Sequence, residues 1–174
     1  MKWSLFVSTR AKVGRAFAGQ RATTPVPITR SRNISVVAAM TKDGMLYNKV
    51  HDSAVRAQDF QTCLEEIKSQ CINLGIENPV IILDNARIHH SQILNWDGFT
   101  QLYLPPYCPF LNPIENCFSK WKNAVIRECC RSEQQLKIAI ETKFNIITAE
   151  DCNGYYRNML RYLHRSANRE EILT

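Results

Sequence analysis

The chain has 174 residues, of which 45% are hydrophobic and 22% charged, and its formal net charge is +6. This length suits one domain with a sizeable core, and the composition is that of an ordinary soluble globular protein. No apolar run approaches the roughly 18 residues that a membrane-spanning helix needs. The apolar patch after Met1 is too short for a signal-peptide core. Residues 1–174 are therefore predicted to form a single intracellular domain with no membrane partner.

The positive charge is unevenly distributed. Residues 1–50 hold nine Lys or Arg and one acid, whereas residues 51–110 carry a net charge of −4 and residues 111–174 a net charge of +2. A basic N-terminal third favours a polyanionic partner such as nucleic acid. A solvated basic surface without a partner is as consistent with the charge alone.

The cysteines indicate a reducing compartment. There are seven, an odd number, at positions 63, 71, 108, 117, 129, 130 and 152, and no CxxC pair occurs. This spacing fits neither a zinc site nor a disulfide framework. We expect mostly buried or neutral thiols in an intracellular protein.

The first predicted elements are an extended segment, a hairpin and a helix. Residues 10–32 combine Arg and Gly with Pro25 and Pro27, which favours basic, extended chain around a turn. The β-branched run at 33–40 predicts a strand, joined by an Asp-Gly turn to a return strand at 45–50. Apolar residues at every third or fourth position predict a helix over 54–74.

The second half predicts two more strands followed by helices. The expected elements are strands at 80–84 and 101–104, a short helix at 91–96, and helices from 112, over 132–147 and over 149–166. The last helix is expected to turn Tyr155, Tyr156, Met159, Leu160 and Leu163 inward, and to carry a basic stripe of Arg157, Arg161, Arg165 and Arg169. The order of elements predicts an α/β fold in which all four strands share one mixed sheet. We place the 54–74 helix on one face and the helix from 112 on the other.

Asp84 is the first candidate for chemistry, since it follows the apolar run Val80 to Leu83. Acids at the carboxyl ends of strands point into the crevice where α/β proteins bind ligands. A turn-forming Asp-Asn pair would explain the same position without function.

Glu115 is the second candidate. Asn112 as N-cap, Pro113 at the first helical position and Glu115 at the third form a near capping box, which alone would explain the glutamate. The same geometry fixes a carboxylate near a helix end, as a metal site requires. Carboxylate oxygens with water and phosphate are what a magnesium ion accepts.

His89 and His90 follow Asp84 by five and six positions. A histidine here could orient a water or a phosphate oxygen beside a metal, or it could be a loop histidine bonded to backbone. The segment Pro105-Pro106-Tyr107 with Pro109 is predicted to be a stiff loop that leads to Asn112, with a structural role.

The stretches LDNARIHHS and LPPYCPFLNPIENCFSKWK resemble the catalytic core of DDE superfamily transposases, in the mariner-like and related insertion-sequence branch. GRAFAGQRA followed by NISVVAAMTKDGML is similar to the hairpin region of that family. The resemblance runs over residues 10–128 and leaves 129–174 as C-terminal helices. Two departures are that Cys108 stands where the family often has serine, and that the two acids are 31 positions apart, a somewhat short spacing.

The resemblance implies an RNase H-like fold, in which a mixed sheet is flanked by helices, and three carboxylates that bind two Mg²⁺ or Mn²⁺ ions. Asp84 would be the second metal-binding acid and Glu115 the third, with Asn85, His89 and Asn112 supporting the site. DNA would be the partner, through charge rather than base reading. The predicted DNA contacts are Arg15, Arg21, Arg30, Arg32, Lys120 and Lys122. A homodimer is compatible with the family, a small-molecule substrate is not expected, and a eukaryotic protein of this kind would be nuclear.

The family's first acid ends a first, central strand just upstream of the hairpin, which would place it at or before Met1. Trp3 to Val7 is apolar and carries no acid, and neither Asp43 nor Asp52 fits the position. We therefore expect the central strand to be missing, with Trp3 to Val7 filling part of the gap. The chain would be a fragment, a decayed copy or a product of a misplaced start.

The function implied is metal-dependent DNA strand cleavage and transfer during transposition of a mobile element, with little or no activity from the chain as written. One rival is a transposase-derived domain that binds DNA or protein without catalysis. Another is an RNase H-like nuclease acting on a different nucleic acid.

Overall fold

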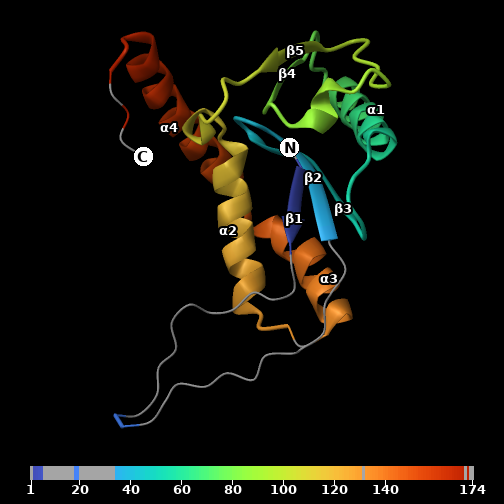
Figure 1. The fold of residues 1–174 in the computed structure, drawn as a ribbon, viewed down its shortest axis with the longest axis vertical. Coiled ribbons are helices and arrows are strands. Elements are labelled where there is room, and N and C mark those ends of the chain that lie inside the picture. The colour runs from blue at the N-terminus through green and yellow to red at the C-terminus, as the bar shows by residue number, and fades with distance from the viewer. Residues whose placement is uncertain (1, 6–17, 20–33, 131, 171, 173–174) are drawn as a thin grey trace.

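The computed structural model describes residues 2–5, 18–19, 34–130, 132–170 and 172 (Figure 1). The strands are β1 (Lys2–Leu5), β2 (Ile34–Thr41), β3 (Gly44–His51), β4 (Val80–Leu83) and β5 (Thr100–Tyr103). The α-helices are α1 (Ala57–Asn73), α2 (Ile114–Arg127), α3 (Glu133–Lys143) and α4 (Ala149–Ala167). Short 3-10 helices lie at Arg87–His90, Pro109–Leu111 and Phe144–Ile146.

The four strands predicted from the sequence are all present, but they do not share one hydrogen-bonded sheet. β1, β2 and β3 form an antiparallel sheet in that order, while β4 and β5 form a separate parallel pair. Within the described residues no ladder joins the two sheets, so the prediction of one mixed sheet was wrong in this respect. The two sheets meet instead through side chains, because Val37 of β2 and Leu83 of β4 belong to the same buried cluster.

The apolar start of the chain, which we expected to fill part of the gap left by the first strand, forms a strand. Lys2–Leu5 forms β1 and pairs antiparallel with Ile34–Val37 of β2, as Lys2 lies opposite Val37 and Leu5 opposite Ile34. The apolar start of the chain thus fills part of the gap, as its β-prone residues allow. Among the strands that the structure describes, β1 lies at the edge of its sheet, because β4 pairs with β5 and not with β1.

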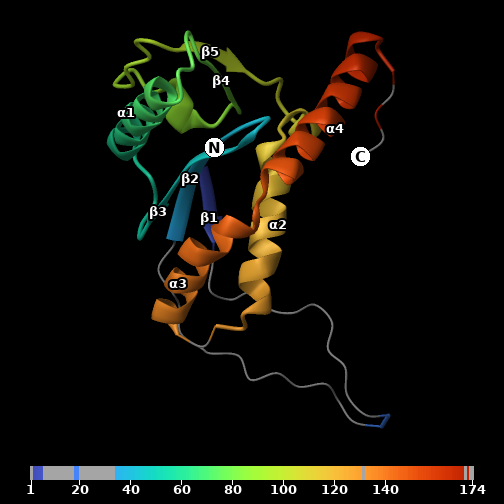
Figure 2. The ribbon, with the colours of Figure 1, turned by 180° about the vertical axis from the view of Figure 1, so that it is seen from behind.

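β2 is buried on both faces, and each face belongs to a different core cluster. Ile34, Val36 and Ala38 pack with α2, α3 and Phe144, whereas Val37 packs with α1 and with Leu83 at the end of β4. This follows from the period of two along a strand, which sends alternate side chains to opposite faces. Figures 1 and 2 show α1 with β4 and β5 on one side of the antiparallel sheet and α2 with α3 on the other.

The predicted apolar stripe of α2 is confirmed. Ile114, Phe118, Trp121 and Val125 are all buried, and the same face adds Cys117. Trp121 is fully buried, and its Nε1–H donates a hydrogen bond of 3.0 Å to the backbone oxygen of Ile140 in α3. The α3 helix starts as predicted, since the Ser132 hydroxyl caps it by accepting from the Gln135 N–H. All seven cysteines are free thiols, and four of them are buried.

One prediction about helices was wrong, and another holds only in part. Residues 91–96 form a turn and irregular chain, and the helical turn lies earlier, at Arg87–His90. In α4 the predicted inward stripe is only partly buried, and Leu163 is 47% exposed. The reason is that α4 extends beyond the body of the domain, as both views show (Figures 1 and 2). None of the described helices is long and apolar enough to cross a membrane.

We predict that Trp121→Ala destabilises the domain by about 3–5 kcal/mol, because it empties a fully buried aromatic site between α2, α3 and Phe144. Denaturant unfolding followed by circular dichroism measures this change. Asn123→Ala, at an exposed position of the same helix, is the matched control and should stay within about 0.5 kcal/mol. A loss below about 1 kcal/mol for Trp121→Ala would contradict this packing.

Candidate functional site

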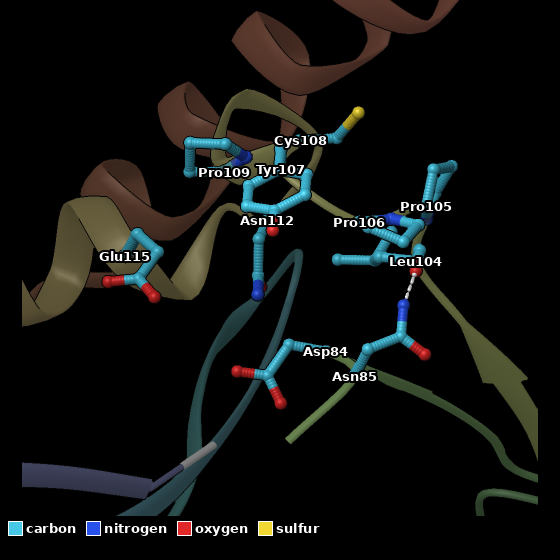
Figure 3. Close-up of a pocket in the computed structure, with 10 residues that line it drawn as sticks. All are labelled: Asp84, Asn85, Leu104, Pro105, Pro106, Tyr107, Cys108, Pro109, Asn112 and Glu115. Atoms are coloured by element: carbon cyan, nitrogen blue, oxygen red, sulfur yellow. Dashed lines mark hydrogen bonds between the residues drawn. The ribbon is translucent and has the colours of Figure 1, made fainter. Parts of the chain in front are cut away.

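A cavity of about 400 Å³ lies between the end of β4 and the start of α2 (Figure 3). Asp84 and Asn85 line it from the chain that follows β4, and Glu115 lines it from the first turn of α2. The remaining lining residues come from the segment between β5 and α2, namely Leu104, Pro105, Pro106, Tyr107, Cys108, Pro109 and Asn112. Asp84 and Glu115, singled out from sequence, therefore border the same cavity.

Asp84 is held in place by its own turn and by a buried histidine. Its Oδ1 accepts a hydrogen bond of 3.2 Å from the backbone N–H of Ala86 and lies 3.1 Å from Nε2 of His89. The His89 contact is the main influence that lowers the pKa of the Asp84 carboxyl, and the Ala86 N–H acts in the same direction. The carboxylate thus shapes a turn and also lines the cavity, and its role in chemistry stays a prediction.

His89 does not face the cavity. Its side chain is fully buried, and its ring packs on Phe60 with 4.6 Å between ring centroids. The Nε2–Oδ1 contact departs from good hydrogen-bond geometry, and no hydrogen-bond partner for Nδ1 is found in the described part of the chain. The ring therefore contacts Asp84 from the buried side, and the suggestion that it orients a water or a phosphate oxygen stays a prediction. His90 is exposed and stacks on Tyr103, with 4.4 Å between ring centroids.

Asn85 connects the ends of β4 and β5. Its Nδ2 donates to the backbone oxygen of Leu104, the interaction dashed in Figure 3. The backbone N–H of Leu104 in turn donates to the oxygen of Leu83 over 2.8 Å. These two bonds fix the start of the proline-rich loop relative to Asp84, which is a supporting role for Asn85.

The helix start at Glu115 differs by one residue from the prediction. α2 begins at Ile114 and its N-cap residue is Pro113, which provides no side-chain cap, so the predicted capping box with Asn112 as N-cap was wrong. The backbone of Asn112 still contributes, because its oxygen accepts from the Glu115 N–H over 3.1 Å. Asn112 is only 9% exposed and lines the cavity, as does the Glu115 side chain.

The two carboxylates act on each other electrostatically. Partial burial raises the pKa of Glu115, and the negative charge of Asp84 raises it further. Within the described residues no third His, Cys, Asp or Glu joins them to form a larger metal-ligating group. Two carboxylates with nearby amide oxygens are suitable donors for a hard divalent cation, although most of its coordination would be left to water or substrate.

The predicted DNA contacts divide into two groups. Arg15, Arg21, Arg30 and Arg32 lie outside the described residues. Lys120 forms an ion pair of 2.5 Å with Asp151 of α4, and burial lowers the pKa of Lys122, which lies within electrostatic reach of Glu115. These six residues therefore stay predictions.

The basic stripe of α4 is shorter than predicted. Arg157 and Arg161 are exposed, whereas Arg165 is bound to Glu170 at 3.2 Å. Arg169 lies beyond the end of α4 with a left-handed φ of 58°, so it does not continue the helical stripe.

The proline-rich loop contributes to the cavity although the sequence suggested only a structural role. Pro105, Pro106, Tyr107, Cys108 and Pro109 all line the space above the two acids. Tyr107 is 99% exposed. An aromatic residue among prolines, close before Asn112, is the signal that could have indicated a binding role.

Comparisons with known proteins identify the family and the fold. Residues 7–137 match the family model described as DDE superfamily endonuclease. The structure is similar to a pre-cleavage Mos1 transpososome, with a TM-score of 0.76 and 16% identity over 99% of this chain and 55% of that one. It is also similar to a Mos1 mariner paired-end complex with Mn, with a TM-score of 0.73 and 18% identity over 100% of this chain and 55% of the other.

The separate Mos1 transposase catalytic domain, solved with Raltegravir and Mg, matches with a TM-score of 0.63 and 16% identity. That match covers 82% of this chain and 78% of the domain, whereas the chain spans about half of the longer Mos1 chains. A search of curated proteins gave no significant match. The likeness confirms the predicted α/β, RNase H-like fold.

We predict that Glu115→Gln stabilises the metal-free domain at neutral pH. A carboxyl whose pKa is raised in the folded state destabilises that state once it ionises. The gain should therefore be absent below the pKa of the unfolded chain, near 4.3, and should grow as pH rises through the raised folded-state pKa. Thermal unfolding in EDTA from pH 4 to pH 8 measures it.

The control for this prediction is Glu77→Gln, at an exposed acid that does not line the cavity. Mg²⁺ should raise the melting temperature of the parent and of Glu77→Gln, but not that of Glu115→Gln. An equal Mg²⁺ response in all three proteins would show that Glu115 is not part of a metal site.

Proposed function

Because the chain belongs to the DDE superfamily of endonucleases, we propose that it is a transposase-type catalytic domain whose Asp84 and Glu115 hold divalent metal for cleavage and transfer of DNA strands. The observation that carries this proposal is the shared cavity. Two acids from separate elements line it, and the charge of Asp84 raises the pKa of Glu115. A cation bound between the two carboxylates would relieve this repulsion.

The chain's own residues prepare this cavity in three ways. The buried ring of His89 and the Ala86 N–H keep Asp84 ionised, so that it is ready to bind a cation near neutral pH. The α2 helix fixes Glu115, and the Asn85–Leu104 bond fixes the loop that closes the cavity. Mg²⁺ or Mn²⁺, both named for the similar Mos1 structures, would stabilise negative charge on a phosphate and activate the attacking hydroxyl group.

DNA is the proposed substrate and partner. The similar Mos1 structures are described as paired-end and strand-transfer complexes, one of them with a left transposon end. In this chain α4 is connected to the cavity loop by the contact of Tyr162 with Phe110, whose ring centroids are 5.4 Å apart. The exposed Arg157 and Arg161 on the same helix would attract phosphates without reading sequence.

A third acid is proposed to complete the site from the direction of β1. Lys2 pairs with Val37, and Val37 shares a buried cluster with Leu83, the residue before Asp84. The first residue of β1, Lys2, is therefore linked through Val37 to the end of β4. An aspartate at position 1 or upstream of it is proposed to complete the three-carboxylate pattern that the family resemblance implies.

The proposed function predicts little or no cleavage by the 174-residue polypeptide and activity once that acid is supplied. The measurement is nicking of supercoiled plasmid and of oligonucleotide duplexes in Mg²⁺ or Mn²⁺. It compares residues 1–174 with a form extended upstream by a β-prone segment that ends in Asp. Asp84→Asn and Glu115→Gln in the extended form should abolish cleavage, whereas Glu77→Gln should leave it unchanged.

A matched extension that ends in Asn instead of Asp is the control. It distinguishes the effect of the added carboxylate from the effect of the added strand. Robust cleavage by residues 1–174, abolished by Asp84→Asn, would show that another acid completes the site. DNA binding without cleavage in every form would favour a transposase-derived binding domain over an enzyme. Cleavage of RNA in preference to DNA would favour the RNase H-like alternative.

A further inference from the structure

Two structural features set Tyr107 apart, namely the exposure of its side chain and its backbone conformation. Its side chain is 99% exposed, and no hydrogen bond or ring contact of that side chain is found in the described part of the chain. Its backbone has φ of +60°, in the left-handed region that bulky side chains rarely adopt. Such strain persists only where the surrounding structure imposes it, and it is concentrated at functional sites.

The loop that carries Tyr107 has restricted backbone freedom. Pro105 and Pro106 precede Tyr107 and Pro109 follows it closely, so the backbone on both sides has restricted φ angles. The loop is anchored at one end by the Asn85–Leu104 hydrogen bond. At the other end it passes into a 3-10 turn, which a bond of 3.1 Å from the Leu111 N–H to the Cys108 oxygen closes, and Leu111 is buried. The tyrosine ring is thus presented to solvent by a loop with little freedom to move.

The position of Tyr107 suggests what the ring is for. Figure 3 shows it at the rim of the cavity, on the loop above the gap between Asp84 and Glu115. A phosphate bound in that gap through a metal would carry a nucleoside on each side, within reach of the rim. An exposed π-face is a sequence-tolerant platform for a base, because every base has a π-face of its own.

We propose that Tyr107 is a nucleobase-stacking residue, which binds an unpaired or extruded base next to the phosphate held between Asp84 and Glu115. The base must be unpaired, because a base inside a duplex has both faces covered by its neighbours. The inference rests on the proposed function, since the phosphate is placed by the two acids. It assigns to the loop the role of holding the strand, in addition to shaping the cavity.

The test measures binding of residues 1–174, in Mg²⁺, to a blunt duplex and to the same duplex with a short single-stranded overhang. The overhang carries 2-aminopurine, whose fluorescence falls when the base stacks. Tyr107→Phe should bind and quench like the parent. Tyr107→Leu, which keeps bulk without a π-system, should lose roughly 5- to 100-fold in affinity for the overhang and should lose the quenching. Affinity for the blunt duplex should change little.

Tyr107→Gly controls for folding, because glycine accepts the left-handed φ without strain. It should fold normally, bind Mn²⁺ like the parent, and lose overhang binding as Tyr107→Leu does. If the parent binds no DNA at all, the proposed function and this inference both fail. If the parent binds DNA and Tyr107→Leu binds the overhang equally well, only this inference fails.

Two further results would overturn the nucleobase assignment. Equal losses for the blunt duplex and the overhang would mean that the ring supports the backbone path and not a base. A change in oligomeric mass with unchanged DNA affinity, measured by light scattering for Tyr107→Leu, would make the exposed ring a protein contact.

Discussion

The structure depends on the burial of β2 between two clusters of apolar side chains. One face of the strand packs on α2 and the other on α1 and the end of β4, through Val36 and Val37 respectively. Because successive residues point to opposite faces, this one strand fixes the relative positions of α2 and β4. Asp84 follows β4 and Glu115 lies in the first turn of α2, so the packing of β2 brings the two acids to one cavity. The site is thus a consequence of core packing between elements that are distant in sequence.

The same packing keeps an unfavourable arrangement of charge in place. Glu115 ionises less readily because it is half-buried and faces Asp84, while the fully buried His89 favours the ionised state of Asp84. The left-handed backbone conformation of Tyr107 adds strain at the rim of the same cavity. Selection for stability alone would not favour these features, and their concentration around one cavity is consistent with the proposed binding of a ligand there. A divalent cation with a nucleic acid phosphate has the charge and chemistry of such a ligand.

Much of this could be predicted from the sequence, where local pattern decides the outcome. The apolar stripe of α2 and the hairpin of β2 and β3 follow from periodicity and turn chemistry. Asp84 and Glu115 were identified from strand and helix ends together with the family resemblance. The division into two sheets could not be predicted, because strand pairing between distant segments depends on tertiary packing. Nor could the burial of His89 behind Asp84, which depends on the Phe60 ring from α1, or the left-handed backbone of Tyr107.

The central claim is that Asp84 and Glu115 hold one cation together. A double-mutant cycle on Mn²⁺ affinity tests it most directly, with bound Mn²⁺ measured by electron paramagnetic resonance for residues 1–174, Asp84→Asn, Glu115→Gln and the double variant. If the acids share the ion, each single substitution removes nearly as much affinity as the double one, and the two effects are strongly non-additive. Independent, additive losses, or affinities equal to that of the parent, would contradict a shared site.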